Sequence, residues 1–117
     1  MRPLDGVTVV SLEQAVAAPF ATRHLADLGA RVIKIERPQV GDFARDYGQT
    51  VKGLSSHSVW LNRSKERRAL DVKHARSQDI LERLIERADV FIQNLAPGAS
   101  ERLGLSAEDL LAKYPRL

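Results

Sequence analysis

Arg37 is the side chain in this sequence whose position suggests chemistry most directly. It follows the apolar segment 31–36, Arg-Val-Ile-Lys-Ile-Glu, which has the composition of a buried strand. In open α/β sheets, ligands bind beyond the carboxyl ends of the strands. An acidic side chain at that place suits a ribose hydroxyl, whereas an arginine suits a phosphate group. Because Glu36 and Arg37 are adjacent, the residues by themselves leave both ligands open.

A second group of cations lies between positions 63 and 76. Its members are Arg63, Lys65, Arg67, Arg68, Lys73 and Arg76. Such a cluster is typical either of a solvated face or of a phosphate-binding surface. The net charge of +3 is compatible with an anionic partner but does not identify one.

Several chemistries are excluded by residue type. The chain contains no cysteine, which rules out disulfides, thiolate catalysis and zinc–cysteine sites. Its histidines, His24, His57 and His74, lack the spacing of metal ligands, so no metal is expected. The turn 13–19 has no glycine and no P-loop motif occurs, which argues against standard NAD or ATP binding.

Length and composition describe one soluble domain. The 117 residues are 44% hydrophobic and 28% charged, which is ordinary for a globular protein. No apolar run approaches the roughly 18 residues of a membrane span, and the start lacks the apolar core of a signal peptide. We therefore predict a cytoplasmic protein with no membrane partner.

The elements that would position these side chains alternate between strands and helices. Strands are predicted at 7–12, 31–36, 68–73 and 89–94. A helix after Pro19 ends at Gly29, a helix capped by Ser77 follows, a short helix ends at Gly104, and Ser106 caps the last helix. The helix after Ser77 carries one apolar face, formed by Ile80, Leu81, Leu84, Ile85 and Ala88. This order predicts a parallel α/β sheet.

Two segments fall outside that pattern. Residues 38–58 lose all periodicity and are expected to form a long functional loop. The final residues 115–117 look like the entry to another strand, and a parallel sheet without it would expose an apolar edge. We therefore expect the chain to be the N-terminal piece of a longer protein.

Four stretches together resemble one protein family in order and spacing. They are "PLDGVTVVSLEQ", "AAPFATRHLADLGARVIKIERP…GD", "LNRSKERRALDVK" and "ADVFIQNLAPGASERLGL…YPRL". This pattern resembles the N-terminal part of family III CoA-transferases, the group of formyl-CoA transferase and α-methylacyl-CoA racemase. The resemblance covers essentially residues 1–117. It implies a Rossmann-like parallel sheet flanked by helices, the N-terminal portion of a large CoA-binding domain, and an interlocked homodimer of the full-length protein.

The resemblance also implies a binding site for coenzyme A. Arg37 would contact the adenosine-phosphate end, which favours phosphate over ribose. The other residues that match the family's CoA site are Ala17 beside the pantetheine, Leu70, Asp71, Val72 and Lys73 around the nucleotide, Asn94, Leu95 and Ala96 after the last strand, and Arg102 on the phosphate side. For Asp71, the residues also support a purely local role, accepting backbone hydrogen bonds in its turn.

By the same resemblance, CoA would pass between an acyl-CoA and a carboxylic acid through an aspartyl anhydride. The nucleophilic aspartate would lie outside this chain, and Asp42 and Asp46 sit in the wrong segment. Two departures stand out. Glu66-Arg67 replaces the common Arg-Ser after Lys65, and a glutamine found in some transferases at the place of Val16 is absent.

Three alternatives remain. One is an acyl-CoA racemase of the same family, which the present residues cannot distinguish from a transferase. Another is a non-catalytic α/β interaction domain. The third is a nucleic-acid-binding module that uses the basic segment 63–76, but this segment lacks interleaved aromatic residues and any recognisable motif. We therefore expect no nucleic-acid partner.

Overall fold

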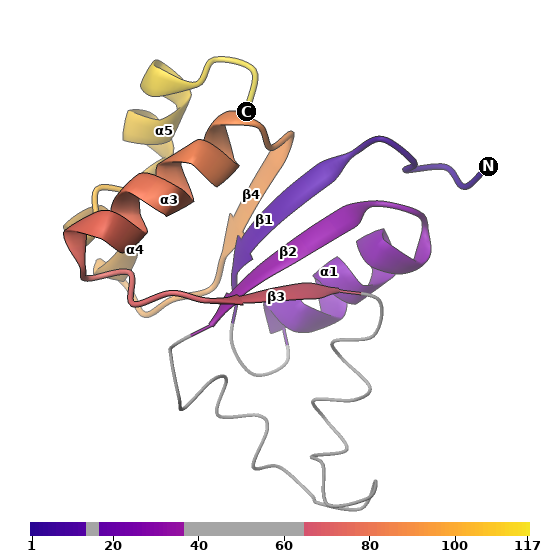
Figure 1. Cartoon of the computed structure of the whole chain (residues 1–117), viewed down its shortest axis with the longest axis horizontal. Coiled ribbons are helices and arrows are strands. Elements are labelled where there is room, and N and C mark those ends of the chain that lie inside the picture. Colours follow the sequence, from indigo (N-terminus) through magenta and orange to yellow (C-terminus); the bar gives the residue numbers. More distant parts are fainter. Residues whose placement is uncertain (14–16, 37–64) are drawn as a thin grey trace, which may run out of the picture.

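The computed structural model describes residues 1–13, 17–36 and 65–117 (Figure 1). These ranges form a parallel sheet of four strands in the order β3-β2-β1-β4. The strands are β1 (Thr8–Leu12), β2 (Arg31–Glu36), β3 (Glu66–Ala69) and β4 (Val90–Gln93). All three pairings are parallel, and Val10 lies between Ile33 and Phe91 in the register. The predicted α/β fold class is confirmed.

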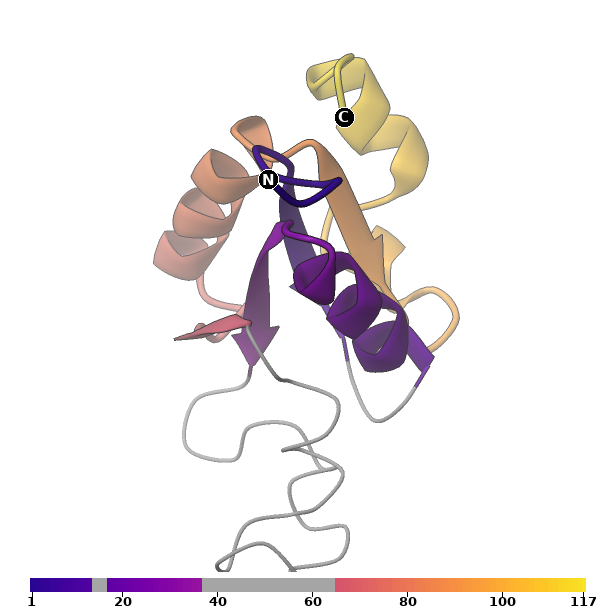
Figure 2. The same cartoon turned by 90° about the vertical axis from the view of Figure 1, so that its right-hand side faces the viewer.

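Helices cover both faces of this sheet. They are α1 (Ala17–Asp27), α3 (Ala75–Glu86), α4 (Ala99–Arg102) and α5 (Ala107–Lys113). Figure 2 shows α1 and α3 on opposite sides of the strands. The strand order is that of a Rossmann-like half, in which β4 lies beside β1 on the side away from β2. A ligand crevice is expected beyond the carboxyl ends of the strands in this arrangement.

Alternate residues of each central strand point to opposite sides of the sheet. Because helices cover both faces, both sets of side chains are buried. On one side, Val10, Leu12, Ile33 and Ile35 form the main core with residues of α3 and α5, including Leu81, Ile85 and Leu110. On the other side, Val9 and Val32 form a smaller core with Ala26 and Ala30. The continuous apolar character of the segment 31–36 reflects this double burial.

The helix α1 buries a different face from the one that its large side chains suggest. Its buried residues are Ala18, Pro19, Thr22 and Ala26. Phe20 is 40% exposed and Leu28, just after the helix, is 46% exposed, and the ring of His24 packs edge-on against Phe20 at 4.5 Å. Small side chains on the inner face let α1 lie close to the sheet. Helical spacing thus predicted the helix, although α1 begins at Ala17 rather than after Pro19; of its large residues, Phe20 lies outside and Leu25 packs against the smaller core.

Gly29 ends this α1 unit, as predicted. Its backbone has φ +110°, a left-handed conformation that favours glycine. A Cβ atom there would lie 2.4 Å from Asp5 Oδ1 and 2.8 Å from Arg2 Cβ. A side chain at position 29 would therefore push the N-terminal segment away from the junction between α1 and β2.

The prediction for the third strand was wrong in its bounds. The strand spans Glu66–Ala69 rather than 68–73. It pairs with β2 through the register Ile33↔Glu66 to Glu36↔Ala69, and the Leu70 amide still donates to the Glu36 carbonyl at 2.9 Å. A turn at Asp71 then ends the strand, because the Asp71 carbonyl accepts the His74 amide at 2.9 Å.

The helix caps follow the same local logic. His74, not Ser77, caps α3, and its Nδ1 accepts the amide of Arg76 at 3.2 Å. Ser77 therefore lies inside the helix that it was predicted to cap. The cap of α5 is confirmed, since Ser106 Oγ accepts the Asp109 amide at 3.1 Å. The predicted long loop at 38–58 lies outside the described residues.

Candidate functional site

The turns that follow the strands bring most of the predicted site residues to one edge of the sheet (Figure 1). Ala17 begins α1, residues 70–73 follow β3, residues 94–96 follow β4, and Arg102 ends α4. We call this set the carboxyl-edge row. Arg37, the residue with the clearest sequence argument, lies outside the described residues. The row therefore contains every other predicted site residue.

These residues form an extended row rather than one cluster. The strands β3 and β4 are the outermost in the sheet, with β2 and β1 between them. Three strand spacings of about 4.8 Å place the turns after β3 and β4 roughly 14 Å apart. A small metabolite could not touch both turns at once, whereas an extended ligand could lie along the whole edge.

The segment after β3 alternates between packing and exposed side chains. Leu70 and Val72 are partly buried against the main core, while Asp71 and Lys73 are exposed. Asp71 Oδ1 accepts the backbone amide of Lys73 at 3.1 Å, and Gln78 Nε2 donates to the Val72 carbonyl at 3.1 Å. Asp71 thus has the local role in its turn that the sequence suggested. Lys73 is the cation that this turn presents to solvent.

The segment after β4 is held by a side-chain contact of its own strand. Gln93 Oε1 accepts the Leu95 amide at 2.8 Å, and the Leu95 side chain packs against the main core. Arg102 is exposed on α4 and folds back over the preceding turn. Gly98, with φ +81°, permits this because a Cβ atom there would lie 2.9 Å from Arg102 Nη1.

A buried polar cluster beneath the start of α1 was not predicted. We call it the Glu13 cluster and define it as Ser11, Glu13, Thr22 and Lys65. Ser11 Oγ and Thr22 Oγ1 both donate to Glu13 Oε2, at 2.6 and 2.5 Å. Lys65 Nζ donates to Glu13 Oε1 at 2.6 Å and to the Pro19 carbonyl at 2.9 Å. The side chains of Glu13 and Lys65 are both fully buried.

Burial also affects the pKa of Lys65. Removal of Lys65 from water lowers its pKa below the usual value, and the Glu13 carboxylate opposes that shift. Lys65 therefore belongs neither to a solvated face nor to a phosphate-binding surface, the two interpretations of the basic segment. Of that segment, Arg67, Arg68, Lys73 and Arg76 are exposed. The available signal was Glu13 itself, a carboxylate directly after a β-branched strand.

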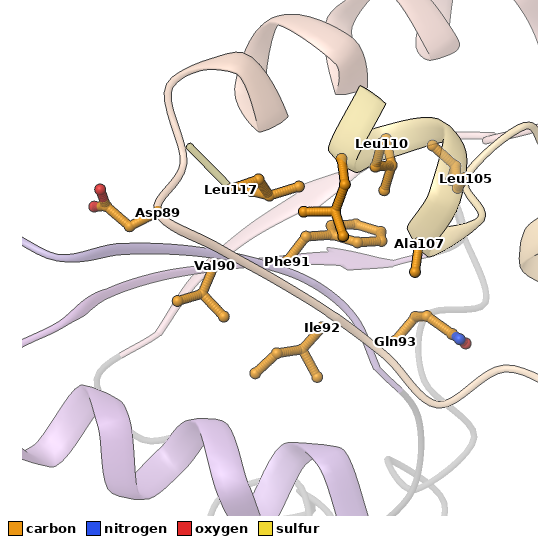
Figure 3. A pocket seen from close by; sticks show the side chains of 10 residues that line it. Asp89, Val90, Phe91, Ile92, Gln93, Leu105, Ala107, Leu110 and Leu117 are labelled. Carbon is orange, nitrogen blue, oxygen red and sulfur yellow. The ribbon is translucent and has the colours of Figure 1, made fainter. Parts of the chain in front are cut away.

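A separate apolar cavity of about 580 Å³ lies along β4. Figure 3 shows Phe91, Leu110 and Leu117 in the space between β4 and α5. Its lining includes Asp89 and all of β4, and contains no lysine or arginine. The cavity therefore lacks the charge expected of a phosphate site.

Two further searches apply to the described residues alone. Within 1–13, 17–36 and 65–117, no three histidine, aspartate or glutamate side chains are grouped so as to hold a metal ion. Over the same ranges, no helix has both the length and the apolar character that crossing a bilayer requires.

Comparison with known proteins gives consistent matches over nearly the whole chain. The chain is 41% identical over 111 residues to succinyl-CoA:glutarate CoA-transferase of Mus musculus, which covers 94% of this chain and 26% of that protein. It is 34% identical over 117 residues to formyl-CoA:oxalate CoA-transferase of Bradyrhizobium sp. (strain ORS 278), which covers 99% of this chain and 28% of that protein.

Comparison with solved structures gives a match over the same part of the chain. The crystal structure of a hypothetical protein from Mycobacterium tuberculosis superimposes with a TM-score of 0.90 at 38% identity, over 100% of this chain and 32% of that one. The chain thus spans about a quarter to a third of the length of the proteins that it matches. The sequence profile of CoA-transferase family III matches residues 4–117. The chain therefore belongs to CoA-transferase family III.

Proposed function

We propose that this chain is the CoA-binding portion of an acyl-CoA:carboxylate CoA-transferase, which transfers CoA between an acyl-CoA and a carboxylic acid. The observation that carries the proposal is the carboxyl-edge row, found in a chain that belongs to family III over residues 4–117. The names of both relatives pair an acyl-CoA with a second acid, glutarate or oxalate. These names favour a transferase over a racemase.

The proposed ligand fits the shape and charge of the row. CoA is extended and carries a pyrophosphate and a 3′-phosphate, so it needs cations at separated points. Lys73 is exposed in the turn after β3, and Arg102 is exposed on α4, which follows β4. Arg37 remains the predicted third cation. The small Ala17, exposed at the start of α1, leaves room for the pantetheine arm. Leu70, Val72 and residues 94–96 would contribute mainly backbone groups, because Leu70, Val72 and Leu95 pack against the core.

The covalent chemistry is proposed to use a residue outside these 117. An aspartate carboxylate oxygen would bond to the thioester carbonyl carbon while the carbon–sulfur bond breaks and CoA leaves as the thiolate. The resulting mixed anhydride then allows the acyl group to be exchanged for a second carboxylic acid. Asp71 is a poor candidate for this nucleophile because its carboxylate accepts the Lys73 amide.

We further propose that residues 1–117 are the N-terminal portion of a larger domain in a cytoplasmic, interlocked homodimer. The chain matches only 26% and 28% of the lengths of the two relatives. In addition, the apolar cavity borders β4, an outermost strand of the described sheet. A further strand beside β4 would cover that apolar surface.

The first test is the thermal stability of the chain with CoA and with 3′-dephospho-CoA. A ligand at about a hundred times its Kd should stabilise the fold by about 2.7 kcal/mol. We expect 3′-dephospho-CoA to stabilise the wild-type chain less than CoA does. We also expect CoA to stabilise the Arg37→Ala variant and the Lys73→Ala/Arg102→Ala double variant less than it stabilises the wild-type chain. Arg116→Ala is the matched control, because Arg116 is 91% exposed and lies 4.0 Å from Asp89, before β4 begins. A cooperative unfolding transition whose melting temperature does not change when CoA is added would refute the proposal.

The second test concerns the nucleophile. An acyl-CoA:carboxylate transfer assay on the isolated 117 residues should give no turnover. Clear turnover would place the nucleophile inside this chain and would overturn that part of the proposal, while leaving CoA binding intact.

A further inference from the structure

The Glu13 cluster joins the end of β1, the start of α1 and the entry to β3. Glu13 directly follows β1, Thr22 lies in the second turn of α1, and Lys65 directly precedes β3. The lysine and the glutamate are 52 positions apart. Lys65 also donates to the Pro19 carbonyl, so the cluster contacts the first turn of α1 through Pro19 and the second turn through Thr22.

Both oxygens of the Glu13 carboxylate are engaged. One accepts from Ser11 and Thr22, and the other accepts from Lys65. The Thr22 hydroxyl has a single hydrogen, and its contact with Glu13 is much shorter than its 3.2 Å contacts with the carbonyls of Ala18 and Pro19. Hydrogen bonds to an ionised acceptor are the stronger ones and prefer one geometry. The carboxylate therefore fixes the direction of each donor.

Such a cluster is a poor way to gain stability alone. Desolvation of two charges offsets much of their attraction, and well-packed apolar side chains often serve as well in the same volume. What a buried pair supplies is orientation, because a shift of either partner leaves an uncompensated charge. Here the oriented element is the first turn of α1, which carries Ala17 of the carboxyl-edge row.

We propose that Glu13 and Lys65 are positioning residues for CoA binding. They hold the start of α1 against the end of β1 and the entry to β3, and so keep Ala17 and the turn 70–73 in their binding positions. This inference rests on the proposed function for its ligand. Its structural part, the fixing of the first turn of α1, is measurable without any ligand.

The test compares two ion pairs that receive the same kind of substitution. One set is Glu13→Gln, Lys65→Met and the double variant. The matched set is Glu66→Gln, Arg31→Met and their double variant, at an exposed pair with a separation of 3.1 Å. The protein used is the longest natural form that contains these residues. If the charge variants fail to fold, Ser11→Ala and Thr22→Val take their place, because these milder variants keep both charges.

The first readout is amide hydrogen exchange without CoA. Helical amides donate to carbonyls four residues earlier, so the amides of Ala21 and Thr22 report on the turn that begins at Ala17. We expect exchange there to rise roughly tenfold in Glu13→Gln and less in Thr22→Val, with α3 unchanged. Equal rates in Glu13→Gln and Glu66→Gln would overturn the inference.

The second readout is CoA affinity. We expect the single variants of Glu13 and Lys65 to weaken CoA binding about tenfold. The double variant should regain melting temperature but not CoA affinity, because it leaves no uncompensated buried charge and yet lacks the charged contacts that orient α1. Recovery of both would reduce the pair to a purely structural role and overturn the inference. If the variants show the expected differences in exchange but the wild-type protein does not bind CoA, the proposed function fails and the positioning of α1 stands.

Discussion

Two consecutive residues, Lys65 just before β3 and Glu66 at its start, make ion pairs in opposite environments. Lys65 contacts Glu13 at 2.6 Å, with both side chains fully buried. Glu66 contacts Arg31 at 3.1 Å, with side-chain exposures of 42% and 60%. Successive residues of a strand point to opposite sides, so one pair lies under α1 and the other faces water. Both pairs join the entry of β3 to the rest of the sheet, at separations of 2.6 and 3.1 Å.

The difference teaches that distance alone does not rank these contacts. Water and ions screen the exposed pair, and flexible side chains lose entropy when they form it. The buried pair is screened little, and each partner is costly to leave alone. We therefore expect breakage of the two pairs to differ by several kcal/mol, although the geometry of both is good.

The largest expected effect is that of Lys65→Met. This change leaves the Glu13 carboxylate buried without its cation, which should lower the free energy of unfolding by about 3–5 kcal/mol. Urea denaturation followed by circular dichroism measures it. If Lys65→Met lowers the free energy of unfolding no more than Arg31→Met does, another group must compensate the Glu13 charge. The two pairs would then not differ in their contribution to stability.

Thr22→Val should have a smaller effect on the same carboxylate. The substitution removes one donor to Glu13 Oε2, while Ser11 and Lys65 remain. The expected loss is about 1–3 kcal/mol, the usual range for a buried polar group that loses its partner. Valine keeps the volume and branching of threonine, so a chemical melt isolates the hydroxyl. A change within error would show that Thr22 donates to a backbone carbonyl instead.

Sequence reasoning located the central elements because their residues are buried on both sides. The segment 31–36 was predicted with the bounds that β2 has, and 7–12 differs from β1 by one residue. Parallel pairing then determines where the strand ends lie. Hence the sequence placed the residues of the carboxyl-edge row at or just beyond strand ends, although residues 70–73 were predicted inside a strand and lie after β3 instead.

The edge strand and the buried pair were harder to predict. The strand β3 reads Glu-Arg-Arg-Ala, which carries no strand pattern and depends on pairing with β2. The Glu13–Lys65 contact joins residues 52 positions apart, so no local pattern connects them. Lys65 therefore resembled one more surface cation. Neither the role of the carboxyl-edge row in CoA binding nor the position of Arg37 is tested by the fold, and both remain predictions.

The double variant Glu13→Gln/Lys65→Met sharpens the contrast by removing both charges together. We expect its stability to lie within about 1 kcal/mol of wild type, since a neutral buried pair needs no compensating charge. A cycle with the two single variants then gives the coupling free energy. If the double variant is as unstable as Lys65→Met, packing of the lysine stem rather than charge would be the dominant contribution.

The exposed pair should show the smallest effect. Removing Arg31 or Glu66 is expected to cost about 0.2–1 kcal/mol, because both groups return to water at little cost. Raising the salt concentration to about 1 M shortens the screening length to about 3 Å and should abolish even that difference. The Glu13–Lys65 coupling should survive the same salt, since ions cannot enter its site. If the contribution of Arg31 to the free energy of unfolding persists at high salt, its contact with Glu66 is shielded from the salt ions. The two pairs would then differ only in how strongly they are shielded.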